Sequence, residues 1–394
     1  MKPLILLVHQ SADLYGSDKV LLSLVKGILD SGEFTPVVVV PESGALITIL
    51  NALHVEVHVA EVGKLKRSVF TPKGLLHLPW RLAQAMRALT RIVNGRSIAV
   101  VHSNTLAVVG GALWARWHKV PHVWHIHEIL LSPRVVSRGL TLLVRWLADT
   151  AMCNSMRTQQ WLLAEQPSLA RRSKVVFNGL PDQPEPSASA VAAFRQKAGA
   201  KSTDLVVTLL GRISRIKGQD VLIEAAGILH AEGRLGRLRF VVIGDAGPGQ
   251  ENLPAQLHAR VRELHLENHF TFLQYEADPN IAWHGTDIAV VPSVEPESFG
   301  MVAIEAMAAS RPVIASAHGG LLDIVIDNET GLLVPPNDAV ALSEAINALS
   351  ADQALRGSMG AAGRKRQQQL FHLDGQIDKT LKIYHHPNGS STQV

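Results

Sequence analysis

The stretch from Pro292 to Ala315, PSVEPESFGMVAIEAMAASRPVIA, says most about the fold of this 394-residue chain. An apolar run ends at Pro292, a loop with two glutamates follows, and small and apolar residues from about Ser298 to Gly300 onward predict a helix. The next apolar run, Pro312–Ala315, predicts a strand. Strand, loop, helix and strand in this order form the repeating unit of a parallel α/β sheet.

The same alternation extends over the whole chain, and its continuous apolar runs predict strands that are buried on both faces. In the first half these runs are Leu4–Val8, Pro36–Val40, His54–Val59, Ile98–His102, His122–His127, Thr150–Asn154 and Lys174–Asn178. In the second half they are Leu205–Gly211, Leu238–Gly244, His269–Leu273, Asp287–Pro292, Pro312–Ala315 and Gly331–Val334. We therefore predict two doubly wound, Rossmann-like α/β domains that face each other across a cleft.

The proline-rich segment 181–190 has no apolar period and is predicted to link the domains. We assign residues 1–182 to an N-terminal domain and 183–370 to a C-terminal domain. Residues 371–386 are predicted to be helical, and 387–394 to be a mobile tail.

The composition excludes several classes of protein. With 47% hydrophobic and 18% charged residues and no low-complexity tract, a disordered or fibrous protein is disfavoured. No apolar stretch reaches the roughly 18 to 20 residues of a membrane span. Cys153 is the single cysteine and no signal-like segment precedes the first strand, so we expect a cytoplasmic protein.

The net charge of +4 hides a strong local bias. No acidic residue lies between Glu61 and Glu128, where ten lysines and arginines occur. Within this interval, 75–93 reads as an amphipathic helix. Its candidate apolar positions are Leu76, Leu78, Trp80, Leu82, Met86, Leu89 and Ile92. Two interpretations stay open: a helix that lies on anionic lipid, and a solvated helix packed on its own domain. Nucleic acid is disfavoured because aromatic residues are not interleaved for stacking.

Glu297 and Glu305 are eight residues apart, about 12 Å along a helix at about 1.5 Å per residue. Two carboxylates at this separation suit the two polyol ends of a nucleotide sugar, with its diphosphate at the helix N-terminus. The alternative is that Glu297 is a helix N-terminal charge and Glu305 an exposed helix residue.

After the first strand of the second domain, Arg212 and Lys217 follow Gly211 within one loop, and Gly218 opens a helix at Gln219. Two cations at a strand end suggest a diphosphate clamp, although the Walker pattern is not matched. Surface charges that flank a turn are the alternative.

Two further strand ends carry glycines. Gly244, Gly247 and Gly249 form G-x-x-G-x-G, the reverse of the dinucleotide fingerprint, so the evidence for NAD is weak. In Tyr15-Gly16-Ser17-Asp18, Ser17 is predicted to cap a helix and Gly16 allows a ligand to reach the backbone. An ordinary capped turn explains this motif equally well.

Alternation places His125 and His127 on one face of a strand, and His127, with Glu128 adjacent, is a candidate catalytic or sugar-contacting group. A zinc site with His102 lacks supporting cysteines or a helical histidine pair. Because Asp-x-Asp elements are absent from the strand ends, we favour metal-independent chemistry.

The run 297–308, ESFGMVAIEAMA, with Gly319-Gly320, resembles the signature of retaining GT-B glycosyltransferases, specifically glycosyltransferase family 4. Gly211-Arg212 with Lys217-Gly218 is similar to the phosphate clamp of that family. The resemblance covers essentially the whole chain, is strongest over 205–336, and is looser in the first domain.

The resemblance implies that Arg212 and Lys217 neutralise a leaving diphosphate, Glu305 holds ribose hydroxyls and Glu297 contacts the donor sugar. Glu297 is preferred to Glu295 because seven residues separate it from Glu305. His127 is similar to the histidine that contacts the donor sugar, with His125 as the fallback. The expected nucleotide-sugar site comprises Gly16, Gly211, Gly244, Ser298, Phe299, Gly300, Met301, Val302 and Glu305. Members of the family also fold the C-terminal helix back onto the first domain.

Asp323 and Ser298 depart from the commoner residues of the family and leave the donor open. We expect a retaining, metal-independent hexosyltransferase without a cofactor. It would transfer a hexose or deoxyhexose from a nucleoside diphosphate sugar to a saccharide hydroxyl. The expected acceptor is lipid-linked, in lipopolysaccharide or exopolysaccharide assembly, with the basic first domain on the inner-membrane surface. The alternatives are a nucleotide-sugar-binding partner without turnover and an NAD-dependent oxidoreductase.

Overall fold

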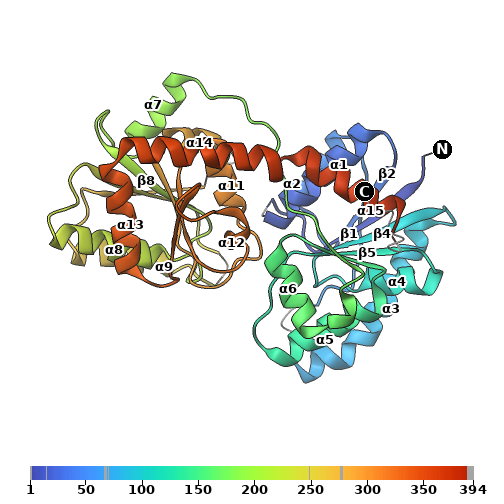
Figure 1. Ribbon diagram of the computed structural model, residues 1–394. Helices are drawn as coiled ribbons and strands as arrows, with labels where there is room; N and C mark the ends of the chain where they lie inside the picture. The colour runs from blue at the N-terminus through green and yellow to red at the C-terminus, as the bar shows by residue number, and fades with distance from the viewer. Residues whose placement is uncertain are drawn as a thin grey trace. The chain divides into compact units, whose positions relative to one another are not determined.

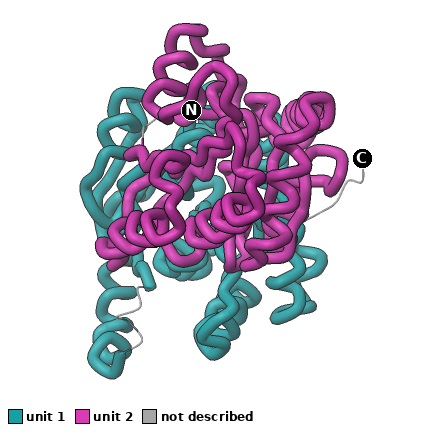
Figure 2. The backbone as a smooth tube through the Cα atoms, turned by 90° about the vertical axis from the view of Figure 1, so that its left-hand side faces the viewer, with its two compact units in different colours: residues 1–179, 373–394 teal, residues 180–372 magenta. Residues whose placement is uncertain are grey.

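The computed structural model describes residues 2–14, 16–65, 69, 71–247, 249–275 and 278–387. The chain divides into two compact units, which Figure 2 distinguishes by colour. Unit 1 contains residues 1–179 and 373–394, and unit 2 contains residues 180–372. Of the features predicted above, Tyr15, two cations of the basic interval (Lys66 and Arg67) and tail residues 388–394 lie outside the described residues.

Unit 1 contains a parallel sheet with the strand order β3-β2-β1-β4-β5-β6-β7. The strands are β1 (Leu4–His9), β2 (Thr35–Val40), β3 (Glu56–Val59), β4 (Ile98–Asn104), β5 (His122–Ile126), β6 (Thr150–Cys153) and β7 (Ser173–Val175). The order reverses between β1 and β4, so the loops that follow these two strands diverge at one point of the sheet edge.

Helices cover both faces of this sheet (Figure 1). One layer consists of α1 (Gly16–Ser31), α2 (Ala45–Ala52) and α15 (Leu373–His385). The other consists of α3 (Pro72–Val93), α4 (Gly110–His118), α5 (Arg134–Leu147) and α6 (Met156–Glu165), which is followed by a short 3-10 turn, Pro167–Leu169. Ile377 of α15 packs so closely on α1 that a Cβ at Gly27 would lie 2.4 Å from it.

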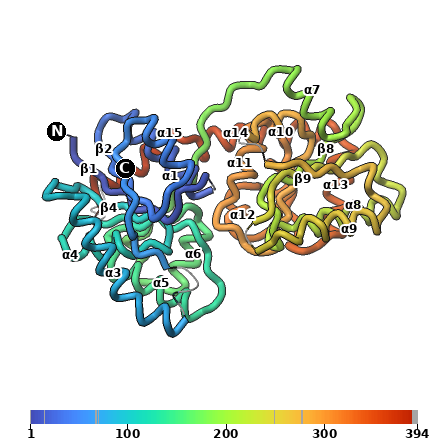
Figure 3. The backbone as a smooth tube through the Cα atoms, turned by 180° about the vertical axis from the view of Figure 1, so that it is seen from behind, coloured from blue at the N-terminus to red at the C-terminus, as the bar shows by residue number. Residues whose placement is uncertain are grey.

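Unit 2 contains a second parallel sheet with the order β10-β9-β8-β11-β12-β13, which reverses between β8 and β11. Its strands are β8 (Leu205–Leu210), β9 (Leu238–Ile243), β10 (Phe270–Leu273), β11 (Ile288–Val291), β12 (Val313–Ser316) and β13 (Gly331–Val334). Its helices are α7 (Ala188–Lys197), α8 (Gln219–Ala231), α9 (Leu253–Glu263), α10 (Asn280–Gly285), α11 (Met301–Ala308), α12 (Leu321–Ile324), α13 (Ala339–Ala351) and α14 (Gln353–Leu370). Figure 3 shows β8 and β9 beside α8, α9 and α13, with which they share one hydrophobic core.

The two doubly wound α/β sheets confirm the predicted fold class, and every predicted strand is present with ends shifted by a few residues. Three local predictions were wrong. Helix α1 begins at Gly16, so Ser17 is not its cap, and the Ser17 hydroxyl instead accepts a hydrogen bond from Gln10. The segment predicted to be the linker becomes helical from Ala188, because the Ser187 hydroxyl accepts from the Ala190 amide and caps α7. The third is the helical spacing of Glu297 and Glu305, because Glu297 lies in the predicted loop and α11 begins only at Met301.

In the part of the chain that the structure describes, we find no helix of the length and apolar character needed to cross a bilayer.

Candidate functional site

Two loops meet in unit 2 where the strand order reverses. Because β8 and β11 are parallel neighbours, the loop after β8 and the loop after β11 leave the sheet side by side. The ammonium nitrogen of Lys217, in the first loop, lies 2.8 Å from Oε1 of Glu297, in the second. The two residues are 80 positions apart in the sequence. This ion pair is the centre of the candidate site.

Gly218 allows the two loops to approach each other. It adopts a left-handed conformation, with φ 72°, and a Cβ at this position would lie 2.0 Å from the carbonyl oxygen of Pro292. Only glycine combines this backbone conformation with this contact without strain. Gly218 also precedes α8, so Lys217 is held between a tight turn and a helix N-terminus.

Glu297 is largely buried and has several polar partners. Lys217 and the Ser293 hydroxyl both donate hydrogen bonds to its Oε1. The His318 ring lies 2.7 Å from the Ser293 carbonyl, and Gly320 donates its amide to the Glu297 carbonyl at 2.7 Å. Burial by itself raises the pKa of Glu297, but the charge and hydrogen bond of Lys217, with smaller contributions from Ser293 and His318, bring the pKa below its ordinary value. The side chain is therefore an ionised carboxylate.

Gly211 and Gly244 bring the loops after β8 and β9 into contact. A Cβ on Gly244, which has φ 154°, would lie 2.0 Å from the Gly211 carbonyl oxygen. A Cβ on Gly247 would lie 2.7 Å from Cδ of Arg212, so the alkyl part of Arg212 covers this glycine loop. Arg212 is exposed, and it brings a second cation to the loop that carries Lys217.

Helix α11 begins at Met301, with Gly300 preceding it at φ 121°. Glu297 therefore lies in the loop before the helix. The distance between Glu297 and Glu305 is not the helical rise that we expected, because this loop packs back on Gly319 and Gly320. Glu305 lies within α11, is half-buried, and accepts a hydrogen bond from the indole nitrogen of Trp283 at 3.3 Å. The other predicted residues of this segment occupy the end of the loop (Ser298 and Phe299) and the first turn of α11 (Met301 and Val302).

In unit 1, polar side chains gather at the carboxyl ends of β1, β4 and β5. His9 ends β1, Asn104 ends β4 and His127 follows β5. Their side chains form a chain of hydrogen bonds: His127 Nε2 to Asn104 Oδ1 at 2.8 Å, and Asn104 Nδ2 to His9 Nδ1 at 2.9 Å. His9 Nε2 then contacts Oδ1 of Asp18, in the first turn of α1, at 2.6 Å.

The rings of His125 and His127 lie on one face, as alternation predicted, with centroids 3.8 Å apart. His125 is fully buried, and both of its ring nitrogens lack a partner in the described part of the chain. Burial lowers the pKa of His127 to about 3. Burial also raises the pKa of Glu128 to about 7, against the opposing effect of hydrogen bonds from the amides of Leu106 and His127. Of the two histidines, only His127 has a ring nitrogen with a hydrogen-bond partner among the described residues. This contact distinguishes it from the fallback, His125.

Among the described residues, no group of three or more His, Cys, Asp or Glu side chains is arranged to hold a metal ion. His102, considered above for zinc, is fully buried, and its Nδ1 lies 2.8 Å from the hydroxyl of Tyr384 in α15.

Sequence reasoning singled out Lys217, Arg212 and Glu297 in unit 2, and the structure brings Lys217 into contact with Glu297. The same reasoning assigned no role to Ser293, His318 or Trp283. It also missed His9 and Asn104. Both are polar residues at the end of an apolar strand, and the same signal drew attention to His127. The signal was available at all three strand ends.

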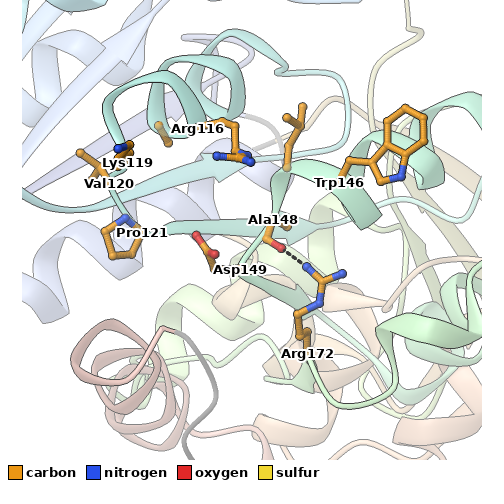
Figure 4. A pocket seen from close by; sticks show the side chains of 10 residues that line it. Arg116, Lys119, Val120, Pro121, Trp146, Ala148, Asp149 and Arg172 are labelled. Atoms are coloured by element: carbon orange, nitrogen blue, oxygen red, sulfur yellow. Dashed lines mark hydrogen bonds between the residues drawn. The ribbon is translucent and has the colours of Figure 1, made fainter.

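A separate pocket of about 330 Å³ lies at the opposite edge of the unit 1 sheet, where β5, β6 and β7 begin (Figure 4). Its lining includes Arg116, Lys119, Trp146, Asp149 and Arg172. The guanidinium of Arg172 donates to the Ala148 carbonyl at 2.6 Å, so this arginine secures the end of α5.

Two family models match nearly all of the chain. Residues 16–183 match Glycosyltransferase Family 4, and residues 191–366 match Glycosyl transferases group 1. The chain belongs to the family 4 glycosyltransferases. Its two sheets are the Rossmann-like domains of the GT-B glycosyltransferase fold.

Curated relatives of this glycosyltransferase include D-inositol 3-phosphate glycosyltransferases. That of Corynebacterium aurimucosum is 38% identical over 178 residues, which are 45% of this chain and 42% of the relative. That of Kineococcus radiotolerans is 36% identical over 205 residues, 49% and 47% of the two chains. The match therefore spans less than half the length of these relatives.

Solved structures match over nearly the whole length. Anabaena HepE in complex with UDP and glucose has a TM-score of 0.82 and 26% identity, covering 97% of this chain and 99% of that chain. A glycosyltransferase from Rickettsia africae has a TM-score of 0.84 at 21% identity, covering 99% and 100%, which is a likeness of fold.

Proposed function

We propose that the protein transfers a hexose or deoxyhexose from a nucleoside diphosphate sugar to a hydroxyl group of a saccharide, with retention at the anomeric carbon. The observation that carries this proposal is the Lys217–Glu297 pair at the point where β8 and β11 diverge. A cation that can take a diphosphate lies there beside a carboxylate that can take sugar hydroxyls, in a family of glycosyltransferases.

The charge of the leaving group determines the roles of the cations. As the bond from the anomeric carbon to the diphosphate breaks, negative charge accumulates on the phosphate oxygens. Lys217, Arg212 and the amides at the start of α11 would stabilise that charge, and because they are in place before the reaction they add little reorganisation cost. Gly211 and Gly244 would let the diphosphate approach the backbone closely.

Glu297 has two states in this proposal. In the structure its carboxylate holds the Lys217 ammonium. A bound diphosphate carries more negative charge and competes for Lys217, which leaves Glu297 to accept hydrogen bonds from the sugar. Glu305 would accept from the ribose hydroxyls, with Trp283 holding one of its oxygens. In unit 1, His127 would contact the donor sugar, and the amide of Gly16, where a Cβ would meet nothing within 4 Å, would lie beside the ligand.

Retention follows if the acceptor hydroxyl attacks from the face that the diphosphate leaves. The new bond joins the acceptor oxygen to the anomeric carbon, and a phosphate oxygen of the departing diphosphate takes the acceptor proton. We propose that this step needs no metal ion, because Arg212 and Lys217 supply positive charge where a divalent cation would.

For the donor, UDP-glucose is the first compound to test, because HepE was solved with UDP and glucose. For the acceptor we propose a lipid-linked saccharide of lipopolysaccharide or exopolysaccharide assembly. The names of the curated relatives make D-inositol 3-phosphate the second acceptor to test.

The lipid-linked acceptor is supported by one surface of unit 1, the basic surface of α3, α4 and α5. These helices are neighbours, contain no acidic residue, and expose Trp80 (59%), Trp117 (76%) and Trp146 (67%). The exposed cations of these helices and of the turn after α4 are Lys73, Arg87, Arg91, Arg116, Lys119, Arg134, Arg138 and Arg145. Tryptophan and arginine together suit the interface of an anionic bilayer. The first half of α3 also leaves Leu75 and Leu76 exposed, so only its second half packs on the domain through Ala85, Leu89 and Val93.

Radiolabelled UDP-glucose, incubated with the protein and either a bacterial lipid extract or D-inositol 3-phosphate, tests the proposal. We expect label in an acceptor product, release of UDP, undiminished turnover in EDTA and an α-linked product from the α-linked donor. A β-linked product would contradict retention, and loss of turnover in EDTA that Mg²⁺ restores would contradict metal independence. If no nucleotide sugar of a full panel gives a product while UDP binds, the protein is a binding partner without turnover.

A further inference from the structure

We propose that Asp18, His9 and Asn104 are positioning residues that fix the protonation pattern of His127, with its Nε2 protonated and its Nδ1 free to accept a hydrogen bond from a sugar hydroxyl. The identity of the hydroxyl rests on the proposed function. The protonation pattern does not, and it can be tested without any substrate.

The three strands that carry these residues are neighbours in the sheet. His9 and Asn104 are direct register partners of β1 and β4, and Asn104 is the register partner of His125 in β5. His127 follows on the same face as His125. The parallel register therefore places three polar side chains in a row across the sheet edge, and α1 supplies Asp18 at one end of the row.

Asp18 determines the direction of the hydrogen bonds. Its Oδ1 accepts from the Ser11 hydroxyl and lies 2.6 Å from His9 Nε2. A carboxylate only accepts hydrogen bonds, so His9 Nε2 carries a proton. In a neutral ring the other nitrogen, Nδ1, then has a lone pair and accepts from the amide nitrogen of Asn104 at 2.9 Å.

The orientation of the Asn104 amide is supported by a separate contact. Its Nδ2 lies 3.5 Å from the carbonyl oxygen of Ser17, which can only accept. With the nitrogen directed toward His9 and Ser17, Oδ1 is directed toward His127 and accepts from Nε2 at 2.8 Å. His9, Asp18 and Asn104 are at most 1% exposed, so water does not compete for these bonds.

The open end of the row is Nδ1 of His127, which has no partner within the described ranges of the chain. The ring is neutral because burial lowers its pKa to about 3. A neutral, Nε2-protonated imidazole offers a lone pair at Nδ1, which can accept from a hydroxyl group but repels a carboxylate. The site should therefore accept a hexose whose hydroxyl group donates to Nδ1. It should discriminate against a hexuronic acid that carries a carboxylate in place of that hydroxyl.

The protonation pattern can be observed by NMR on the full-length protein labelled with ¹⁵N-histidine, with His127→Gln used to assign the resonances. At pH 7 we expect Nε2 of His127 to carry the proton. Asn104→Ala should convert His127 to a mixture of tautomers. Ser103→Ala is the matched control, because Ser103 is the preceding residue of β4, is equally buried, and bonds His122 instead. A proton on Nδ1 in the wild type, or an unchanged spectrum in Asn104→Ala, overturns the proposal.

Kinetics separates positioning from a general structural role. With UDP-glucose as donor, we expect Asn104→Ala to lower kcat/KM by about tenfold, the effect of one hydrogen bond, and Ser103→Ala to leave it within about twofold. In a His127→Ala background, Asn104→Ala should cause no further loss, because Asn104 acts through His127. Additive losses, or turnover of UDP-glucuronate as fast as UDP-glucose, overturn the proposal. If Asn104→Ala fails to fold, the wild-type spectrum and the same measurements on Asn104→Ser test the proposal instead. If the spectra show the expected protonation pattern but no donor is turned over, the proposed function is contradicted and the positioning proposal is not.

Discussion

Lys217 and Glu297 form an ion pair of 2.8 Å between two loops, and the sheet rather than the local sequence brings them together. The pair lies where two parallel strands diverge, and its lysine is 23% and its glutamate 15% exposed. Each partner therefore keeps some access to solvent while the other neutralises its charge.

Replacing Lys217 by alanine should lower kcat by about a hundredfold or more, the size of effect seen when a donor to a developing anion is removed. Arg212→Ala should also abolish most of the turnover. The comparison is Arg215→Ala, which removes an exposed cation of the same loop and should leave kcat within about twofold. Steady-state assays with UDP-glucose measure all three variants. Full activity of Lys217→Ala would remove the lysine from the proposed chemistry.

Glu297→Gln should reduce kcat far more than it weakens UDP binding, because the carboxylate is proposed to contact the sugar and not the nucleotide. Turnover assays and calorimetry with UDP measure the two effects separately. Equal losses in both would place Glu297 at the nucleotide instead.

The same variant should change the pH dependence of stability. The pKa of Glu297 is lowered in the folded protein, so its ionised form stabilises the fold above the unfolded pKa of 4.5. That contribution is lost as the pH falls below this value toward the folded pKa. Urea unfolding between pH 3 and 6 should therefore show a steeper acid loss in the wild type than in Glu297→Gln. Parallel curves would contradict this expectation.

Glu128 should have the opposite effect. Its pKa is raised to about 7, so between pH 4.5 and 7 the unfolded chain has released a proton that the folded chain still holds. Stability should fall across this window and level off above it. The Glu128→Gln variant, whose amide oxygen can still accept from Leu106, should lack this fall. Urea unfolding at pH 5, 6, 7 and 8 measures it, and a difference between the two proteins that does not vary with pH would contradict it.

Gly218→Ala should disturb the site through the backbone. Gly233 provides the control, because its φ of 70° matches that of Gly218 but nothing lies within 4 Å of its added Cβ. Gly233→Ala should cost about 1–2 kcal/mol from the left-handed conformation alone. Gly218→Ala should cost at least about 1 kcal/mol more, because its Cβ overlaps the Pro292 carbonyl, and it should weaken UDP binding. Thermal unfolding and calorimetry test both effects, and equal stability of the two variants would show that the loops can separate freely.

Binding to vesicles tests the basic surface of α3, α4 and α5. The wild type should sediment with anionic vesicles and less with neutral ones, and binding should weaken as salt is added. Trp80→Ser with Trp146→Ser should weaken binding to anionic vesicles, whereas Tyr275→Ser, at an exposed aromatic residue of unit 2, should not. Equal binding of the wild type and the double variant would assign these tryptophans no lipid contact.

The sequence was sufficient to predict the strands, because strands buried on both faces leave short continuous apolar runs that alternate with longer helical patterns along the chain. It also singled out Lys217, Glu297 and His127, which lie in the segments that follow β8, β11 and β5. It did not predict which of them would touch. The contact between Lys217 and Glu297 depends on the adjacency of β8 and β11, and the contact between His9 and Asn104, 95 positions apart, depends on the register of β1 and β4. Strand order is a property of the whole sheet and leaves no mark on the local residue pattern.

Helix α15 has a consequence for how the chain is made. Ile377, Leu381 and Tyr384 belong to the hydrophobic core of unit 1, although they are synthesised after the whole of unit 2. A chain still on the ribosome therefore carries an N-terminal sheet with one apolar face covered by α1 and α2 alone until α15 emerges. Deletion of α15 would remove these three residues from the core of unit 1, which is synthesised first. Unit 2 would keep all of its own residues.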